Sequence, residues 1–135
     1  MLLGLDVSTA VVGICILDNS GKLILLDHID LSKHKVNIYE KAEIVKKQLE
    51  KLYDNYSINK VVIEESLLRF RVGKSSAHVL SVLIKFNGIV SYICSQIFKK
   101  PIHHIFAPHA RKLCGVVVDK KRKKLLGIKP IIIEH

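Results

Sequence analysis

The sequence is poor in cysteine. Its 135 residues include only three, which are widely spaced and embedded among apolar residues: Cys15, Cys94 and Cys114. This odd number and this spacing fit neither a disulfide framework nor a zinc knuckle. We therefore expect a reducing compartment and a cytoplasmic protein.

The sequence also lacks a secretory leader and an uninterrupted apolar run. No charged segment precedes a short apolar stretch and a cleavage site, because the first predicted strand starts at the beginning of the chain. The longest apolar stretch, 79–98, contains a central Lys85, which is costly in a bilayer, and is further interrupted by Asn87, Ser91 and Gln96. We expect neither secretion nor a membrane span.

What the sequence does have is apolar content and positive charge. With 49% apolar residues, 135 residues allow a single α/β domain, 1–135, with a real core. Lysine and arginine number 22 against 12 acids, which gives a net charge of +10 and favours a polyanionic partner, nucleic acid first. Charge alone does not separate nucleic acid from an acidic membrane surface, so the motifs have to decide.

Apolar patterning predicts the element order βββαβαβα. Strands are expected at 2–7, 11–17 and 22–29, with a hairpin turn at 19–21. An amphipathic helix at 37–56 precedes a buried strand at 60–63. A long helix at 75–99, capped by Ser75 or Ser76, is followed by a strand at 102–106 and a short helix at 108–113. The predicted fold is α/β, with a mixed five-stranded sheet of three antiparallel and then two parallel strands, flanked by helices.

Two acidic residues stand in apolar strands. Asp6 is expected to point inward from the strand Leu2 to Val7, and Glu64 ends the strand that begins near Lys60. A buried carboxylate is costly unless it is paired, hydrogen-bonded or bound to metal. Adjacent strands would bring these two together, which predicts a divalent metal site. Glu65, one residue along, should point to the other face.

Three sequence segments carry a family resemblance. They are Gly4-Leu5-Asp6-Val7-Ser8 with Gly13, then Val62-Ile63-Glu64, then the loop with Arg69, Arg71 and Gly73 that runs into Ser75-Ser76-Ala77. Over residues 1 to about 126 the chain resembles ribonuclease H-like nucleases, and within them RuvC-type Holliday-junction resolvases.

The resemblance implies an activity. Asp6 and Glu64 would be catalytic residues that hold Mg²⁺, with Mn²⁺ as a substitute, for hydrolysis of phosphodiester bonds in branched DNA. A resolvase would act as a two-fold homodimer, because symmetric nicks need two identical sites. The helix 75–99 is the candidate interface, and a helix buried in the monomer core is the alternative.

The sequence departs from the family after Glu65. The family completes its metal site with an Asp-x-x-Asp pair on a C-terminal helix, whereas the only later acids here are Asp119 and Glu134. We interpret the chain as lacking that acidic helix. A non-catalytic nucleic-acid binder is therefore an alternative to the nuclease.

Basic residues supply candidate DNA contacts in three places. The loop after the acidic strand combines charge with an aromatic ring, which suits phosphate and base contacts, at Arg69, Phe70, Arg71 and Lys74. By the resemblance, Arg111 and Lys112 on the short helix are further contacts. The densest basic run would neutralise phosphates, with a solvated loop as the alternative, and consists of Lys120, Lys121, Arg122, Lys123 and Lys124.

Two other interpretations are weaker. The segment from Gly4 to Thr9 also resembles the first phosphate loop of sugar kinases and actin-like ATPases, but those proteins need two such domains and this chain is too short. His103, His104 and His109 suggest zinc, but the first two alternate across a strand and no cysteine lies nearby at ligand spacing.

Overall fold

The structure is a computed structural model, and it describes residues 1–65 and 76–113. The chain divides into two compact units, Met1–Ile105 and Phe106–His135. The sheet and the two long helices belong to the first unit, and a short helix belongs to the second. The two units are described separately below.

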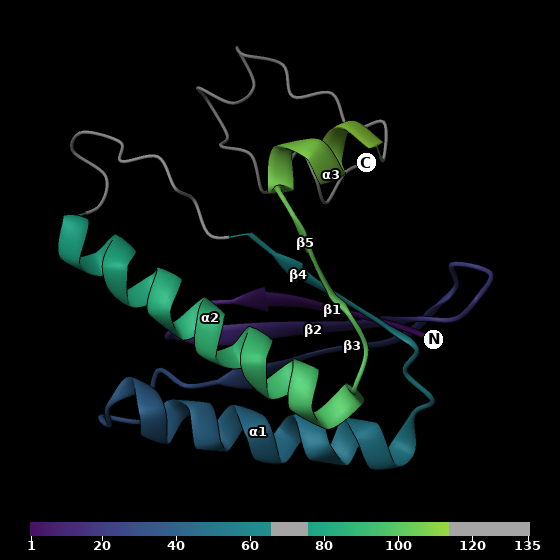
Figure 1. Cartoon of the computed structure of the whole chain (residues 1–135). Helices are drawn as coiled ribbons and strands as arrows, with labels where there is room; N and C mark the ends of the chain where they lie inside the picture. The colour runs from purple at the N-terminus through teal and green to yellow at the C-terminus, as the bar shows by residue number, and fades with distance from the viewer. Residues whose placement is uncertain (66–75, 114–135) are drawn as a thin grey trace. The chain divides into compact units, whose positions relative to one another are not determined.

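The first unit contains a five-stranded mixed sheet. Its strands are β1 (Leu2–Val7), β2 (Val11–Leu17), β3 (Leu23–Asp30), β4 (Lys60–Glu64) and β5 (Ile102–Ile105), in the spatial order β3-β2-β1-β4-β5 (Figure 1). The pairs β1–β2 and β2–β3 are antiparallel, and the pairs β1–β4 and β4–β5 are parallel. This topology confirms the predicted fold class.

Local hydrogen bonds fix where the helices begin. Helix α1 (Ile38–Asn55) starts with a capping box, in which the Asn37 side chain accepts from the backbone of Glu40 and the Glu40 carboxylate accepts from the backbone of Asn37. Helix α2 (Ala77–Phe98) is capped by Ser76, whose hydroxyl accepts from the Val79 N–H. Helix α3 (Ala107–Leu113) lies in the second unit. The predicted order βββαβαβα is confirmed.

One face of the sheet forms the core. Alternate strand residues are buried there, among them Leu3, Leu5, Val12, Ile14, Ile16, Val61 and Ile63. They join one apolar cluster with buried residues of α1 and α2, namely Ala42, Val45, Leu49, Phe86, Val90, Cys94 and Phe98. Figure 1 shows both long helices on the same side of the sheet. Because each fully buried large aliphatic side chain contributes roughly 1.5–3 kcal/mol, this layer holds the unit together.

Among the helices of the described residues, only α2 is long enough and apolar enough to cross a membrane. This criterion considers length and composition alone. The core helix of a globular protein meets the same criterion. A stripe of α2 that includes Phe86, Val90 and Cys94 lies in the core cluster, which accounts for its apolar composition. The absence of a membrane span stays a prediction.

Candidate functional site

The two predicted acidic residues lie on neighbouring parallel strands. Strand β1 pairs with β4 in a register that sets Leu5 opposite Ile63, so the next residues along are Asp6 and Glu64. Adjacent strands are about 4.8 Å apart, and residues at matching positions in a parallel pair point to the same face. The register therefore places these two residues side by side on one face of the sheet, at the carboxyl ends of β1 and β4.

Asp6 is exposed, and the prediction that it points inward was wrong. Leu3 and Leu5 face the helices, and strand alternation therefore sends Asp6 to the opposite face. Glu64 is half-buried on that same face, because Val61 and Ile63 take the core positions of β4. The case for a site at Asp6 therefore rests on the pairing of the two carboxylates and not on burial.

Glycines open the surface around Asp6. Gly13 is its cross-strand partner on β2, and a Cβ atom built at Gly13 would lie 3.6 Å from the Asp6 Cβ. A hollow of about 260 Å³ lies here, lined by Gly4, Leu5, Asp6, Gly13, Ile14, Cys15, Leu26 and Asp27. A larger cavity of about 730 Å³, between β3 and α1, contains neither Asp6 nor Glu64. Of these two cavities, only the smaller one is lined by a carboxylate of the pair, Asp6.

The turn that follows Asp6 is held by hydrogen bonds. The Ser8 hydroxyl donates to the Val11 carbonyl at 2.8 Å and accepts from the Val11 N–H at 3.0 Å. The Lys41 ammonium on α1 donates to the Thr9 carbonyl at 2.7 Å. These bonds anchor the end of β1 to its neighbours and so limit the movement of Asp6.

The end of β4 is held by groups that the sequence did not single out. The Asn87 side chain on α2 donates from Nδ2 to the Glu64 carbonyl at 3.0 Å, and the Glu65 N–H donates to the Ile105 carbonyl at 2.8 Å. Asn87 is 5% exposed and is the only buried polar residue in the described part of the chain. The sequence showed Asn87 only as an interruption of an apolar run, although a polar residue on the core stripe of a helix is itself a signal.

The remaining predicted residues are only partly described. Lys112 is exposed on α3, and the backbone of Arg111 belongs to the same helix. The two histidines of β5 are consecutive and therefore point to opposite faces of the sheet. The His104 Nε2 lies 3.1 Å from the Ser91 hydroxyl on α2. The other predicted DNA contacts lie outside the described residues, namely Arg69, Phe70, Arg71, Lys74, Lys120, Lys121, Arg122, Lys123 and Lys124.

Two carboxylates form only part of a metal site. Among residues 1–65 and 76–113, no group of three or more histidine, cysteine, aspartate or glutamate side chains is placed to hold a metal ion. Mg²⁺ nevertheless accepts this kind of donor set, because it is commonly bound through one or two carboxylates together with water and substrate phosphates. Asp6 and Glu64 therefore fit a magnesium ion that needs further oxygen ligands.

Comparison with known proteins gives structural similarity without sequence similarity. No protein-family model and no curated protein matches the sequence. The structure is similar to RuvC of Thermus thermophilus in complex with a Holliday junction substrate, with a TM-score of 0.64 and 11% identity over 82% of this chain and 67% of that one. A second structure of Thermus thermophilus RuvC matches with a TM-score of 0.61 and 12% identity over 95% of this chain and 81% of that one.

The yeast mitochondrial Holliday junction resolvase Ydc2 is a third match, with a TM-score of 0.54 and 14% identity over 98% of this chain. The chain spans 61% of the length of that yeast enzyme. At identities this low, the similarity shows the fold alone. The chain has a RuvC-like, ribonuclease H-like fold.

Proposed function

We propose that the protein is a metal-dependent endonuclease that acts on branched DNA, with Asp6 and Glu64 as its metal ligands. One observation carries the proposal, which is the pairing of these two carboxylates on one face of neighbouring parallel strands. The fold shared with RuvC supports the choice of a four-way junction as substrate. The cation would be Mg²⁺, with Mn²⁺ as a substitute, because both take oxygen ligands.

Some residues of the site would bind the metal, and others leave room for the DNA backbone. Bound divalent metal would supply the chemistry, which is activation of the attacking water and stabilisation of the departing 3′ oxygen. Asp6 and Glu64 would hold the metal, and the Ser8 turn and the Asn87 bond hold the two strand ends. Gly13 keeps the approach to Asp6 open for a phosphodiester backbone. The net charge of +10 attracts that backbone.

We further propose a homodimer across α2. Besides its buried stripe, α2 presents an exposed face with Ile84, Gly88 and Tyr92 spaced by four residues. A glycine inside a helix costs about 1 kcal/mol relative to alanine. Among the described residues, a Cβ atom at Gly88 would meet nothing within 4 Å, so packing against residues 1–65 and 76–113 does not account for this glycine. Close approach of a second copy would account for it, and a two-fold dimer suits symmetric nicking of a junction.

A non-catalytic junction-binding protein is the second candidate. The observation that favours it is the lack of a third acidic, histidine or cysteine ligand among the described residues. Such a protein would bind junctions without divalent metal and would not cut them.

Nicking of a labelled four-way DNA junction tests the proposal. We expect paired nicks in Mg²⁺ or Mn²⁺ from the wild-type chain and a loss of about 100-fold or more in Asp6→Asn and Glu64→Gln, because a bound metal supplies several kcal/mol of transition-state stabilisation. Glu50→Gln is the matched control, since Glu50 is also an exposed carboxylate but lies on α1, across the sheet from Asp6. Junction binding in EDTA should be unchanged in all three variants.

The outcomes separate the two candidates. Nicks that survive in Asp6→Asn would contradict the assigned site. Metal-independent binding by the wild-type chain with no nicks would favour the non-catalytic candidate.

A further inference from the structure

The peptide unit that joins Glu64 to Glu65 is held from both sides. Its carbonyl accepts the Asn87 Nδ2–H at 3.0 Å, and its N–H donates to the Ile105 carbonyl at 2.8 Å. The first bond comes from a side chain of α2 and the second from the main chain of β5. With both of its polar groups engaged, the plane of this peptide is fixed at the last residue of β4.

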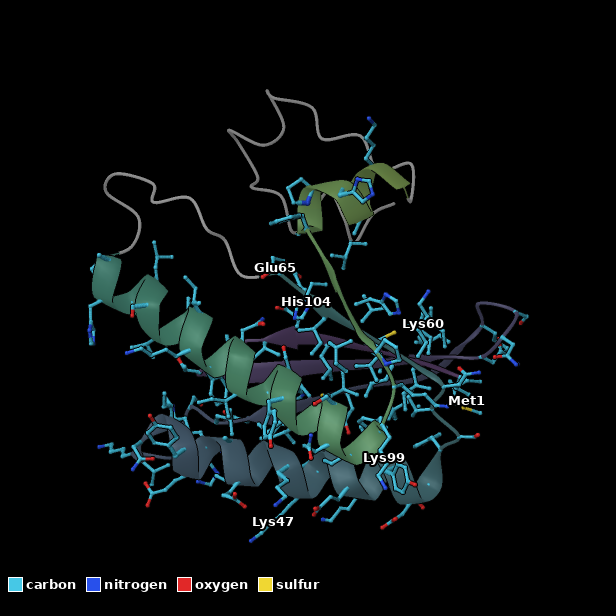
Figure 2. All side chains as sticks on the ribbon, in the orientation of Figure 1. Met1, Lys47, Lys60, Glu65, Lys99 and His104 are labelled. Atoms are coloured by element: carbon cyan, nitrogen blue, oxygen red, sulfur yellow. The ribbon has the colours of Figure 1, made fainter. Side chains whose placement is uncertain are left out.

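Asn87 is itself held in place. It is 5% exposed within the core layer, where an unpaired amide would be costly. The Ser91 hydroxyl donates to the backbone carbonyl of Asn87 at 2.7 Å and lies 3.4 Å from the side-chain Oδ1 of Asn87. The same hydroxyl lies 3.1 Å from His104 Nε2. The connected groups run from β5 through α2 to the end of β4, and Figure 2 shows His104 and Glu65 at the same end of the sheet.

A buried amide at this position is not needed for packing. Val90 and Cys94 lie on the same stripe of α2 and are fully buried apolar residues. An apolar side chain at 87 would fill the core as they do. Compared with an apolar residue, asparagine adds an N–H group that donates to the Glu64 backbone carbonyl.

We propose that Asn87 is a positioning residue for Glu64. By fixing the peptide that follows Glu64, the Asn87 bond sets the backbone angles of Glu64 and so aims its carboxylate at the face that carries Asp6. Partners one step behind a metal ligand typically change metal affinity by about 10- to 100-fold when they are removed. This inference rests on the proposed function, in which Glu64 is a metal ligand.

Mn²⁺ affinity and amide hydrogen exchange, both measured without DNA, test the inference. The variants are Asn87→Leu and Asn87→Met, which are apolar, remove the donor and keep the core filled. Val90→Ala is the control, because it destabilises the same stripe of α2 and leaves the donor intact. Asp6→Asn reports whether Mn²⁺ binds at the proposed site.

We expect both Asn87 variants to bind Mn²⁺ about tenfold or more weakly and to exchange the Glu65 amide faster. Val90→Ala should lower the stability without changing the Mn²⁺ affinity. If Asp6→Asn weakens Mn²⁺ binding and both folded Asn87 variants bind it as the wild type does, the positioning role is overturned and the metal site stands. If Asp6→Asn and the wild type bind Mn²⁺ equally, the metal site fails and the positioning role fails with it.

Discussion

At the scale of single residues, burial decides the chemistry of the Cys94 thiol. Desolvation raises its pKa to about 12 from the ordinary value of 9.0. Only the thiolate reacts with alkylating agents, so this cysteine is inert in the folded protein at neutral pH. Cys15 is half-buried, and desolvation raises its pKa as well.

The Cys94 thiol makes the stability depend on alkaline pH. Above about pH 9 the unfolded chain releases this proton while the folded chain keeps it up to about pH 12, so unfolding is favoured as the pH rises through this window. We expect the urea midpoint to fall from pH 9 upward and to fall less in Cys94→Val, where this buried thiol is absent. Lysine and tyrosine titrate in both proteins, so the difference between the two curves is the measurement. Parallel curves would contradict the assigned pKa.

At the scale of elements, the start of α1 depends on the Asn37 capping box. The Asn37 Oδ1 accepts from the Tyr39 and Glu40 N–H groups, each at 3.0 Å. Loss of such a cap typically costs about 1 kcal/mol. We therefore expect Asn37→Ala to lower the melting temperature by about 4 °C, measured by circular dichroism. Glu50→Ala, on the exposed side of the same helix, should stay within about 0.5 kcal/mol of the wild type. Equal losses in both variants would mean that the cap adds nothing.

The elements also show which features sequence patterns can reach. β1 and β2 were predicted to the residue, because the Ser8 and Asp18 turns interrupt short apolar runs. The sequence did not predict which face of the sheet Asp6 occupies, because leucines occupy both faces of β1. Only packing against α1 and α2 selects the core face. The Asn87–Glu64 bond joins residues 23 apart, and no local pattern reports such a contact. The two candidate carboxylates could thus be predicted from the sequence, whereas the exposure of Asp6 and the hydrogen bond from Asn87 to Glu64 could not.

At the scale of the whole molecule, the proposed dimer can be tested apart from catalysis. Ile84 is 44% exposed on α2, so Ile84→Glu should leave the fold intact while placing two charges in the interface. We expect a monomer by sedimentation equilibrium with an unchanged melting temperature. Val36→Glu is the control, because Val36 is similarly exposed and lies before α1. A dimer that persists in Ile84→Glu would remove α2 from the interface.

The distribution of the positive charge determines how the proposed DNA binding would respond to salt. Each phosphate contact contributes about 0.9 to the slope of log K against log salt concentration. We expect Lys120→Gln with Lys121→Gln to lower the slope of junction binding by about 2. The matched pair Lys47→Gln with Lys51→Gln should change it little, because both lysines are exposed on α1, across the sheet from Asp6. Both pairs remove two charges from the same net charge of +10. Equal losses would therefore mean that the overall charge attracts DNA, whereas a larger loss in the first pair would mean that DNA contacts the basic run at 120–124 rather than α1.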